Sequence, residues 1–181
     1  MAQITVSFEP TPNPQSMKFN FSAPIAEEMA EFNDAGNCRR SPLATKIFGF
    51  PWAAGIMIGH DFVTITKQDW VEWDVIAEPL ASLLQEHIER GEAVLLPETS
   101  VAASEDSEQV ILIKRILNEE IRPAVAMDGG DIVFHRYEEG VVYVYMRGAC
   151  SGCPSSMMTL KDGVEARLKA ALPEIIEVIA L

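Results

Sequence analysis

Apolar residues recur at helical spacing in some stretches of the chain and alternate with polar residues in others. The helical spacing predicts long helices over 74–90, 107–125 and 155–172, and shorter ones over 25–32 and 41–48. The alternating, β-branched and aromatic stretches predict strands over 4–8, 16–21, 53–58, 61–66, 132–137, 141–147 and 175–181. Most neighbouring strands are joined by short turns, which is typical of the α+β class.

The periodic pattern breaks once, over 92–106, where small and acidic residues follow one another without a repeat. This composition predicts a flexible acidic linker. The linker would separate a first small α+β domain over 1–91 from a second over 107–181. The second domain is expected to run helix, strand, strand, helix, strand.

Composition and charge exclude several classes of protein. The chain has 181 residues, a formal net charge of −13 and 48% hydrophobic residues. This acidity argues against a nucleic-acid partner or an anionic membrane surface, both of which need a basic patch. No apolar run approaches the ~20 residues of a membrane span. We expect neither partner.

The cysteine count and the first residues bear on the compartment. Three cysteines are an odd number, which argues against a disulfide framework. The first six residues have no basic segment typical of a signal or transit peptide. On these grounds we expect a cytoplasmic protein.

Two of the three cysteines, Cys150 and Cys153, form a C-x-x-C motif between the strand over 141–147 and the helix over 155–172. Pro154 suits the first position of a helix, where its missing N–H costs nothing. Thiols at a helix N-terminus lie near free N–H groups and the positive end of the helix dipole, which favour the thiolate. A thiolate binds metal or attacks a disulfide.

Four interpretations of this motif compete. A structural zinc site needs four ligands, and the nearest candidates, His135 and Cys38, lie on a strand and in the other domain. Simple packing is a poor explanation, because glycines and a proline surround the pair. A thioredoxin-like redox pair normally follows the first strand of a parallel βαβ unit, whereas this pair follows a hairpin. An iron–sulfur cluster needs four thiolates, so two chains would have to share it. Spacing alone ranks the redox pair and the cluster about equal.

The other residues with possible chemistry have simpler roles. We expect Cys38 to be a solitary thiol, His60 a turn residue, His87 a helix-surface residue and His135 a cross-strand packing residue. The stretch Asp-Gly-Gly-Asp at 128–131 is expected to form a turn at a helix end. No catalytic set occurs in a recognisable motif, so we do not expect an enzyme.

Several motifs of the chain closely resemble those of the NifU-like (Nfu) iron–sulfur scaffold proteins. In the second half they are Met-Asp-Gly-Gly-Asp at 127–131, Gly-Ala-Cys-Ser-Gly-Cys-Pro-Ser-Ser at 148–156 and Thr-Leu-Lys at 159–161. In the first half they are Thr-Pro-Asn-Pro at 11–14, Ser-Met-Lys-Phe at 16–19, Ser-Pro-Leu-Ala at 41–44 and Asp-Phe-Val-Thr-Ile-Thr-Lys at 61–67. The likeness covers nearly the whole chain, in the two-domain order of that family.

The resemblance implies a carrier of a [4Fe–4S] cluster that bridges two subunits and is delivered to apo-proteins. Carried over to this sequence, the ligands would be Cys150 and Cys153 of each subunit, giving a homodimer when the cluster is bound. The implied partners are upstream cluster donors and apo iron–sulfur recipients. The chain lacks the additional cysteine-bearing domains of the larger NifU proteins, so docking of a desulfurase is not implied. The alternative is a thiol–disulfide oxidoreductase that uses Cys150 and Cys153.

Overall fold

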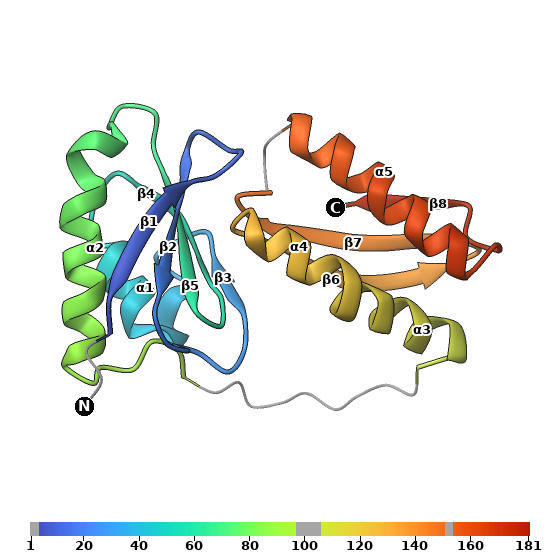
Figure 1. The fold of residues 1–181 in the computed structure, drawn as a ribbon, viewed down its shortest axis with the longest axis horizontal. Coiled ribbons are helices and arrows are strands. Elements are labelled where there is room, and N and C mark those ends of the chain that lie inside the picture. The colour runs from blue at the N-terminus through green and yellow to red at the C-terminus, as the bar shows by residue number, and fades with distance from the viewer. Residues whose placement is uncertain (1–3, 97–105, 151–153) are drawn as a thin grey trace. The chain divides into compact units, whose positions relative to one another are not determined.

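The computed structural model describes residues 4–96, 106–150 and 154–181. The chain divides into two compact units, Met1–Thr99 and Ser100–Leu181, drawn blue to green and yellow to red in Figure 1. Each unit combines a β-sheet with helices, so the predicted α+β class is confirmed. None of the described helices has the length and apolar character needed to cross a bilayer.

The first unit is a five-stranded antiparallel sheet with helices on one face (Figure 1). Its strands lie in the order β1-β2-β5-β4-β3. Their bounds are β1 Val6–Pro10, β2 Ser16–Phe21, β3 Ala30–Phe32, β4 Ala53–Ile58 and β5 Phe62–Lys67. The helices are a short 3₁₀ helix η1 (Cys38–Arg40), α1 (Pro42–Ile47) and α2 (Trp73–Glu89).

Alternating side chains of the central strands form the core of the first unit. Phe19 of β2, Ile65 of β5 and Ile56 of β4 point to the same face and are almost fully buried. Leu43 of α1 and Leu84 of α2 belong to the same apolar cluster. The predicted end of α2 is confirmed, since Gly91 follows it with φ 67°, the left-handed conformation expected there.

The helix predicted over 25–32 is wrong. The structure has a short edge strand, β3, at Ala30–Phe32. Ala30 pairs with Ile58 and Phe32 with Ile56, and both side chains are buried. Pairing with a strand more than twenty residues away decides the conformation here, and local periodicity carries no trace of it.

The first residues of the stretch predicted as a linker pack against the first unit. Val94 is 6% exposed, and its carbonyl oxygen accepts a 2.6 Å hydrogen bond from the Ser41 hydroxyl. The Leu96 amide donates to the Arg40 carbonyl oxygen at 2.7 Å. The part of the predicted linker over 97–105 lies outside the described residues.

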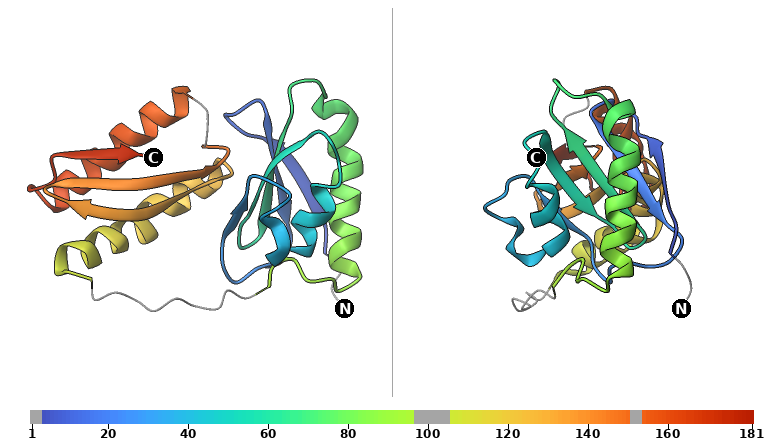
Figure 2. Two further views of the ribbon diagram at one scale, coloured as in Figure 1. Left: turned by 180° about the vertical axis from the view of Figure 1, so that it is seen from behind. Right: turned by 90° about the vertical axis from the view of Figure 1, so that its left-hand side faces the viewer.

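The second unit has the predicted order helix, strand, strand, helix, strand. Its elements are α3 (Glu108–Ile116), a π-helical turn η2 (Leu117–Ile121), α4 (Arg122–Met127), β6 (Gly130–Glu138), β7 (Val141–Gly148), α5 (Pro154–Ala171) and β8 (Glu177–Ala180). The strands lie in the order β6-β7-β8, with β6 and β7 antiparallel and β8 parallel to β7. Helices pack on one face of this sheet (Figures 1 and 2).

The first predicted helix of the second unit, over 107–125, is interrupted where Pro123 predicted a kink or an end. Ser107 caps the helix, because its hydroxyl accepts from the Val110 amide at 3.3 Å. The helix then widens into η2 immediately before α4, which has Pro123 in its first turn. Proline has no N–H to continue the hydrogen-bond ladder, which explains the irregular turn at this position.

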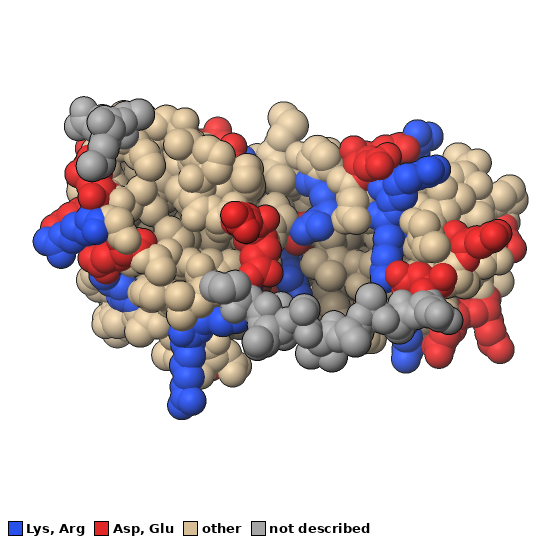
Figure 3. Space-filling model, turned by 90° about the horizontal axis from the view of Figure 1, so that it is seen from below, with Lys and Arg blue, Asp and Glu red and all other residues tan. Residues whose placement is uncertain are grey.

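Charged side chains of both signs occur on the surface of each unit (Figure 3). On the face shown in Figure 3, acidic and basic side chains are interspersed over both units. Ion pairs form within each unit, such as Arg40 with Glu28 in the first and Lys161 with Glu177 in the second. Exposed pairs of this kind contribute little to stability.

Candidate metal centre

Cys150 lies in the turn between β7 and α5, two residues after the end of the strand. It is 4% exposed and belongs to the apolar cluster of the second unit, with Ile132 and Val144. Pro154 opens the helix, as the sequence predicted. Cys153 lies outside the described residues. The assignment of both cysteines as ligands therefore stays a prediction.

The thiol of Cys150 rests on backbone that carries no side chain. Gly130 opens β6 and pairs with Gly148 at the end of β7. A Cβ added to Gly130 would overlap the Cys150 sulfur and lie 3.1 Å from the Arg147 carbonyl oxygen. Only glycine fits this position, because any side chain would displace the thiol.

Two further glycines lie beside Gly130 and Cys150. Gly129, just before β6, has φ 73° and Gly148, at the end of β7, has φ 65°, a conformation that other residues rarely adopt. The Ala149 amide donates to the Gly129 carbonyl oxygen at 3.1 Å, which ties the turn before β6 to the turn after β7. We call Gly129, Gly130 and Gly148 the glycine seat of Cys150.

An ion pair lies directly beside the glycine seat. Asp131 is fully buried and accepts two hydrogen bonds from Arg122, from Nε at 2.7 Å and from Nη2 at 2.9 Å. Arg122 also donates to the Asn118 side chain at 3.1 Å. The turn predicted over 128–131 is confirmed in part: Asp128 and Gly129 form a turn after α4, whereas Gly130 and Asp131 belong to β6. The pairing of Asp131 with Arg122 was not predictable from the sequence, because a carboxylate and a cation nine residues apart give no periodic signal.

Cys38 lies in the first unit and has hydrogen-bond partners of its own. It is 2% exposed, its thiol donates to the Ala35 carbonyl oxygen at 2.9 Å, and the Thr45 hydroxyl donates to its sulfur at 3.4 Å. No other cysteine belongs to that unit. Within the described ranges, no three His, Cys, Asp or Glu side chains are grouped so that they could hold a metal ion.

The histidines differ from one another in their surroundings. His135 stacks on Tyr145 of the neighbouring strand with ring centroids 4.8 Å apart, so the predicted cross-strand packing is confirmed. His87 was expected on a helix surface, and this is wrong, because its side chain is fully buried. Burial lowers the pKa of His87, and the nearby Lys46 lowers it further, while the Ala93 carbonyl and Glu92 act in the opposite direction.

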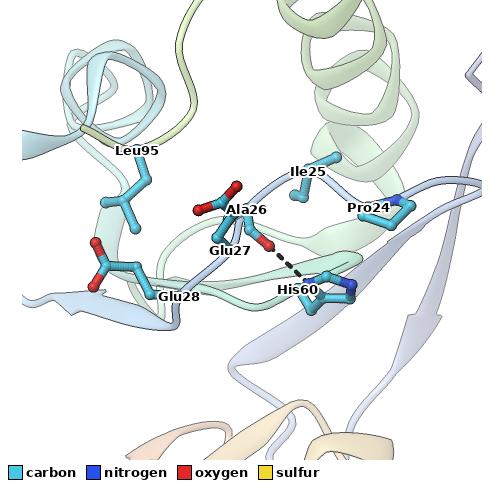
Figure 4. Close-up of a pocket in the computed structure, with 7 residues that line it drawn as sticks. All are labelled: Pro24, Ile25, Ala26, Glu27, Glu28, His60 and Leu95. Carbon is cyan, nitrogen blue, oxygen red and sulfur yellow. Dashed lines mark hydrogen bonds between the residues drawn. The ribbon is translucent and has the colours of Figure 1, made fainter. Parts of the chain in front are cut away.

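A pocket of about 900 Å³ opens in the first unit (Figure 4). Its lining comes from the loop before β3, from the turn between β4 and β5 and from Leu95. His60 lies in that turn, as expected, with Nδ1 2.8 Å from the Ala26 carbonyl oxygen. Glu28, another lining residue, pairs with Arg40. The pocket contains no cysteine.

Two family models match the chain. The model of the scaffold protein Nfu/NifU N terminal matches residues 6–91, and the model of the NifU-like domain matches residues 113–179. The mitochondrial NFU1 iron-sulfur cluster scaffold homolog of Homo sapiens is 33% identical over 175 residues, which are 94% of this chain and 69% of that protein. This chain belongs to the NifU-like family of iron–sulfur cluster scaffold proteins.

A second relative agrees with the family, and one solved structure also matches. The mitochondrial NifU-like protein 5 of Arabidopsis thaliana is 37% identical over 179 residues, or 94% of this chain and 65% of that protein. The chain thus spans slightly less than two thirds of the length of that relative. The solution NMR structure of a NifU-like protein from Saccharomyces cerevisiae matches with 28% identity and a TM-score of 0.47, over 53% of this chain and 87% of that one.

The expected cytoplasmic location is contradicted by these relatives. The plant and human proteins are both named as mitochondrial. The expectation rested on the first six residues and on the cysteine count. A reducing compartment and the lack of a disulfide framework do not distinguish the cytosol from the inside of an organelle.

Proposed function

We propose that this NifU-like protein carries a [4Fe–4S] cluster between two subunits and passes it to apo-proteins. The cluster is the cargo of the protein, and its ligands are Cys150 and Cys153 of each subunit. The observation that carries the proposal is the seating of Cys150 on bare glycine backbone, just before a helix N-terminus, in the NifU-like domain.

The number of thiols supports a shared cluster. A [4Fe–4S] cluster takes four cysteine thiolates, and this chain has three cysteines. Cys38 is buried in the other unit and has its own hydrogen-bond partners. Two ligands from each of two chains complete the set.

Cys150 would bind iron as a thiolate. Its closeness in sequence to the N-terminus of α5 favours that form, whereas its burial in the apolar cluster opposes it. The Cys150 sulfur packs directly against the Gly130 backbone, where a side chain would displace it. A cluster held by two ligands per subunit is also easily given up, because an acceptor can replace one pair of thiolates at a time.

The proposal is tested by anaerobic reconstitution with iron and sulfide, followed by the visible spectrum, iron and sulfide counts and light scattering. We expect about two irons per chain and the mass of a dimer, from one cluster shared by two chains. Incubation with an apo-ferredoxin should then move the cluster to the acceptor. A monomer with four irons would refute the shared site. A protein without bound iron but with a reducible Cys150–Cys153 disulfide would support the oxidoreductase instead.

A further inference from the structure

The ion pair of Arg122 and Asp131 lies between α4 and the glycine seat. We infer that this pair sets the position of the Cys150 thiol, so that Arg122 and Asp131 are positioning residues for cluster binding. This inference rests on the proposed function for its last step. Neither residue is offered as a ligand.

The first step is the fixed place of Asp131. Its carboxylate is fully buried, and a buried charge is tolerated only when it is paired and hydrogen-bonded. Arg122 supplies both bonds with a planar fork that holds the carboxylate in one orientation. The start of β6 is thereby tied to the first turn of α4.

The second step leads from Asp131 to the thiol. Gly130 is the residue before Asp131, and a Cβ there would overlap the Cys150 sulfur. The sulfur therefore packs directly against this part of the backbone. Gly129 is bonded to Ala149, the residue before Cys150. A shift of 129–131 by a fraction of an ångström must therefore move the sulfur or open a gap beneath it.

The glycines alone would leave this stretch of backbone free to adopt several conformations. Glycine has the largest conformational freedom of all residues, and 129–130 is a pair of them. Asp131 is the first residue after this pair that a side-chain interaction can hold. By holding Asp131, the ion pair limits the backbone conformations open to the two glycines before it.

The test compares Asp131→Asn with Arg167→Gln in the full chain. The first variant keeps the size of the side chain and removes its charge. The second breaks the pair of Arg167 with Glu120, which also lies in the second unit but is exposed. Each apo-protein is treated with iodoacetamide, and the alkylation rate of every cysteine is measured by mass spectrometry of its peptides.

We expect the alkylation of Cys150 to be slow in the parent protein, where it is 4% exposed, and about tenfold faster in Asp131→Asn. The alkylation of Cys38, which lies in the other unit, should not change and serves as an internal control. Arg122→Lys keeps the charge but not the two parallel bonds, so its Cys150 rate should be intermediate. After reconstitution, loss of iron to a chelator should follow the same order.

The outcomes separate this inference from the proposed function. If the parent protein takes up no iron, the proposed function fails, while the Cys150 alkylation rates still decide the positioning role. If Asp131→Asn only lowers the unfolding midpoint and leaves the Cys150 rate equal to that of Arg167→Gln, the pair is merely structural and the inference is wrong. Should Asp131→Asn not fold, Arg122→Lys gives the same comparison with a milder change.

Discussion

Cys38 and Cys150 are almost equally buried and each belongs to an apolar cluster, yet their backbone settings differ. Cys38 lies in η1 among bulky side chains of the first core, and its thiol both donates and accepts a hydrogen bond. Cys150 lies in a turn, on a floor of glycine backbone and ahead of a helix N-terminus. Exposed fractions of 2% and 4% do not distinguish them.

The roles proposed for the two cysteines therefore rest on their backbone settings and not on their burial. Cys38 has hydrogen bonds to Ala35 and Thr45 inside an apolar core, and such a thiol behaves as a small apolar residue. Cys150 packs against the Gly130 backbone, where any side chain would displace the sulfur. The two thiols differ in the groups that contact the sulfur and not in the fraction of the residue that is exposed to solvent.

The largest expected effect separates the two cysteines directly. Cys150→Ala should abolish cluster binding, and so should Cys153→Ala, because either change leaves at most half of the four thiolates. Cys38→Ala should keep about two irons per chain. It should lower the free energy of unfolding of the first unit by about 1 kcal/mol through lost packing and hydrogen bonds. Iron counts after reconstitution measure the first effect.

The stability of each unit can be followed on its own. Trp52, Trp70 and Trp73 are the three tryptophans and all belong to the first unit, whereas the three tyrosines all belong to the second. Tryptophan and tyrosine fluorescence therefore report separate unfolding transitions.

Loss of the cluster in Cys38→Ala, with the cluster kept in Cys150→Ala, would reverse the assignment of the two thiols.

The next effect tests the glycine seat. Gly130→Ala should lower the free energy of unfolding of the second unit by about 2 kcal/mol, because the new methyl group overlaps the Cys150 sulfur. It should also weaken cluster retention. Gly163→Ala is the matched control, since a Cβ there meets open space on α5, and it should stabilise the unit by about 0.5–1 kcal/mol. Equal effects of the two substitutions would show that the seat has no special role.

Local sequence signals predicted the elements around Cys150 well. The β-branched run of β7, the glycines and Pro154 each act over a few residues, and together they place the thiol between a strand and a helix. The end of α2 at Gly91 was predictable for the same reason.

Features that depend on distant residues could not be predicted. The edge strand β3 exists because β4 pairs with it, and the pattern of 25–32 alone favours a helix. The packing of Val94 depends on Ser41, more than fifty residues earlier. The pair of Arg122 with Asp131 forms only when a helix start and a strand start are brought together by the fold. None of these contacts leaves a periodic trace in the sequence.

A smaller effect distinguishes the two units by pH. In neutral His87, a proton on Nε2 donates to the Ala93 carbonyl oxygen at 3.1 Å, and Nδ1 faces the Glu92 carboxylate at 3.3 Å. The pKa of His87 is lowered, mainly by burial, so the folded first unit binds fewer protons than the unfolded chain. The contribution of neutral His87 to the stability of the first unit is fully present above the ordinary histidine pKa of 6.5. It is lost as the pH falls below that value towards the pKa of the folded state.

Denaturant unfolding of the full chain, repeated at several pH values between about 7.5 and 5.5, measures this effect. The tryptophan transition should shift to lower denaturant as the pH falls, and His87→Gln, which cannot become charged, should remove part of the shift. In the second unit, a hydrogen bond from Lys169 lowers the pKa of the Glu165 carboxyl group. The contribution of Glu165 to the stability of that unit is lost only below the ordinary value of 4.5, which is outside this pH range. A tyrosine transition that moves as much as the tryptophan one over this range would contradict the assignment to His87.

The smallest effect is expected at the end of the β6–β7 hairpin that is remote from Cys150. Glu138 pairs with Val141, so Glu139 and Gly140 form a two-residue turn with φ 47° and 83°. Asparagine tolerates the left-handed conformation better than glutamate, and Asn-Gly is a favoured pair in such turns. Glu139→Asn should therefore stabilise the second unit by about 0.5 kcal/mol. Glu138→Asn removes the same charge from a strand residue, so it controls for charge and should not stabilise.

Because the turn and the glycine seat lie at opposite ends of the hairpin, the Cys150 alkylation rate should be unchanged in Glu139→Asn. A faster or slower rate would mean that the hairpin moves as one body and that the seat is not set locally by Arg122 and Asp131.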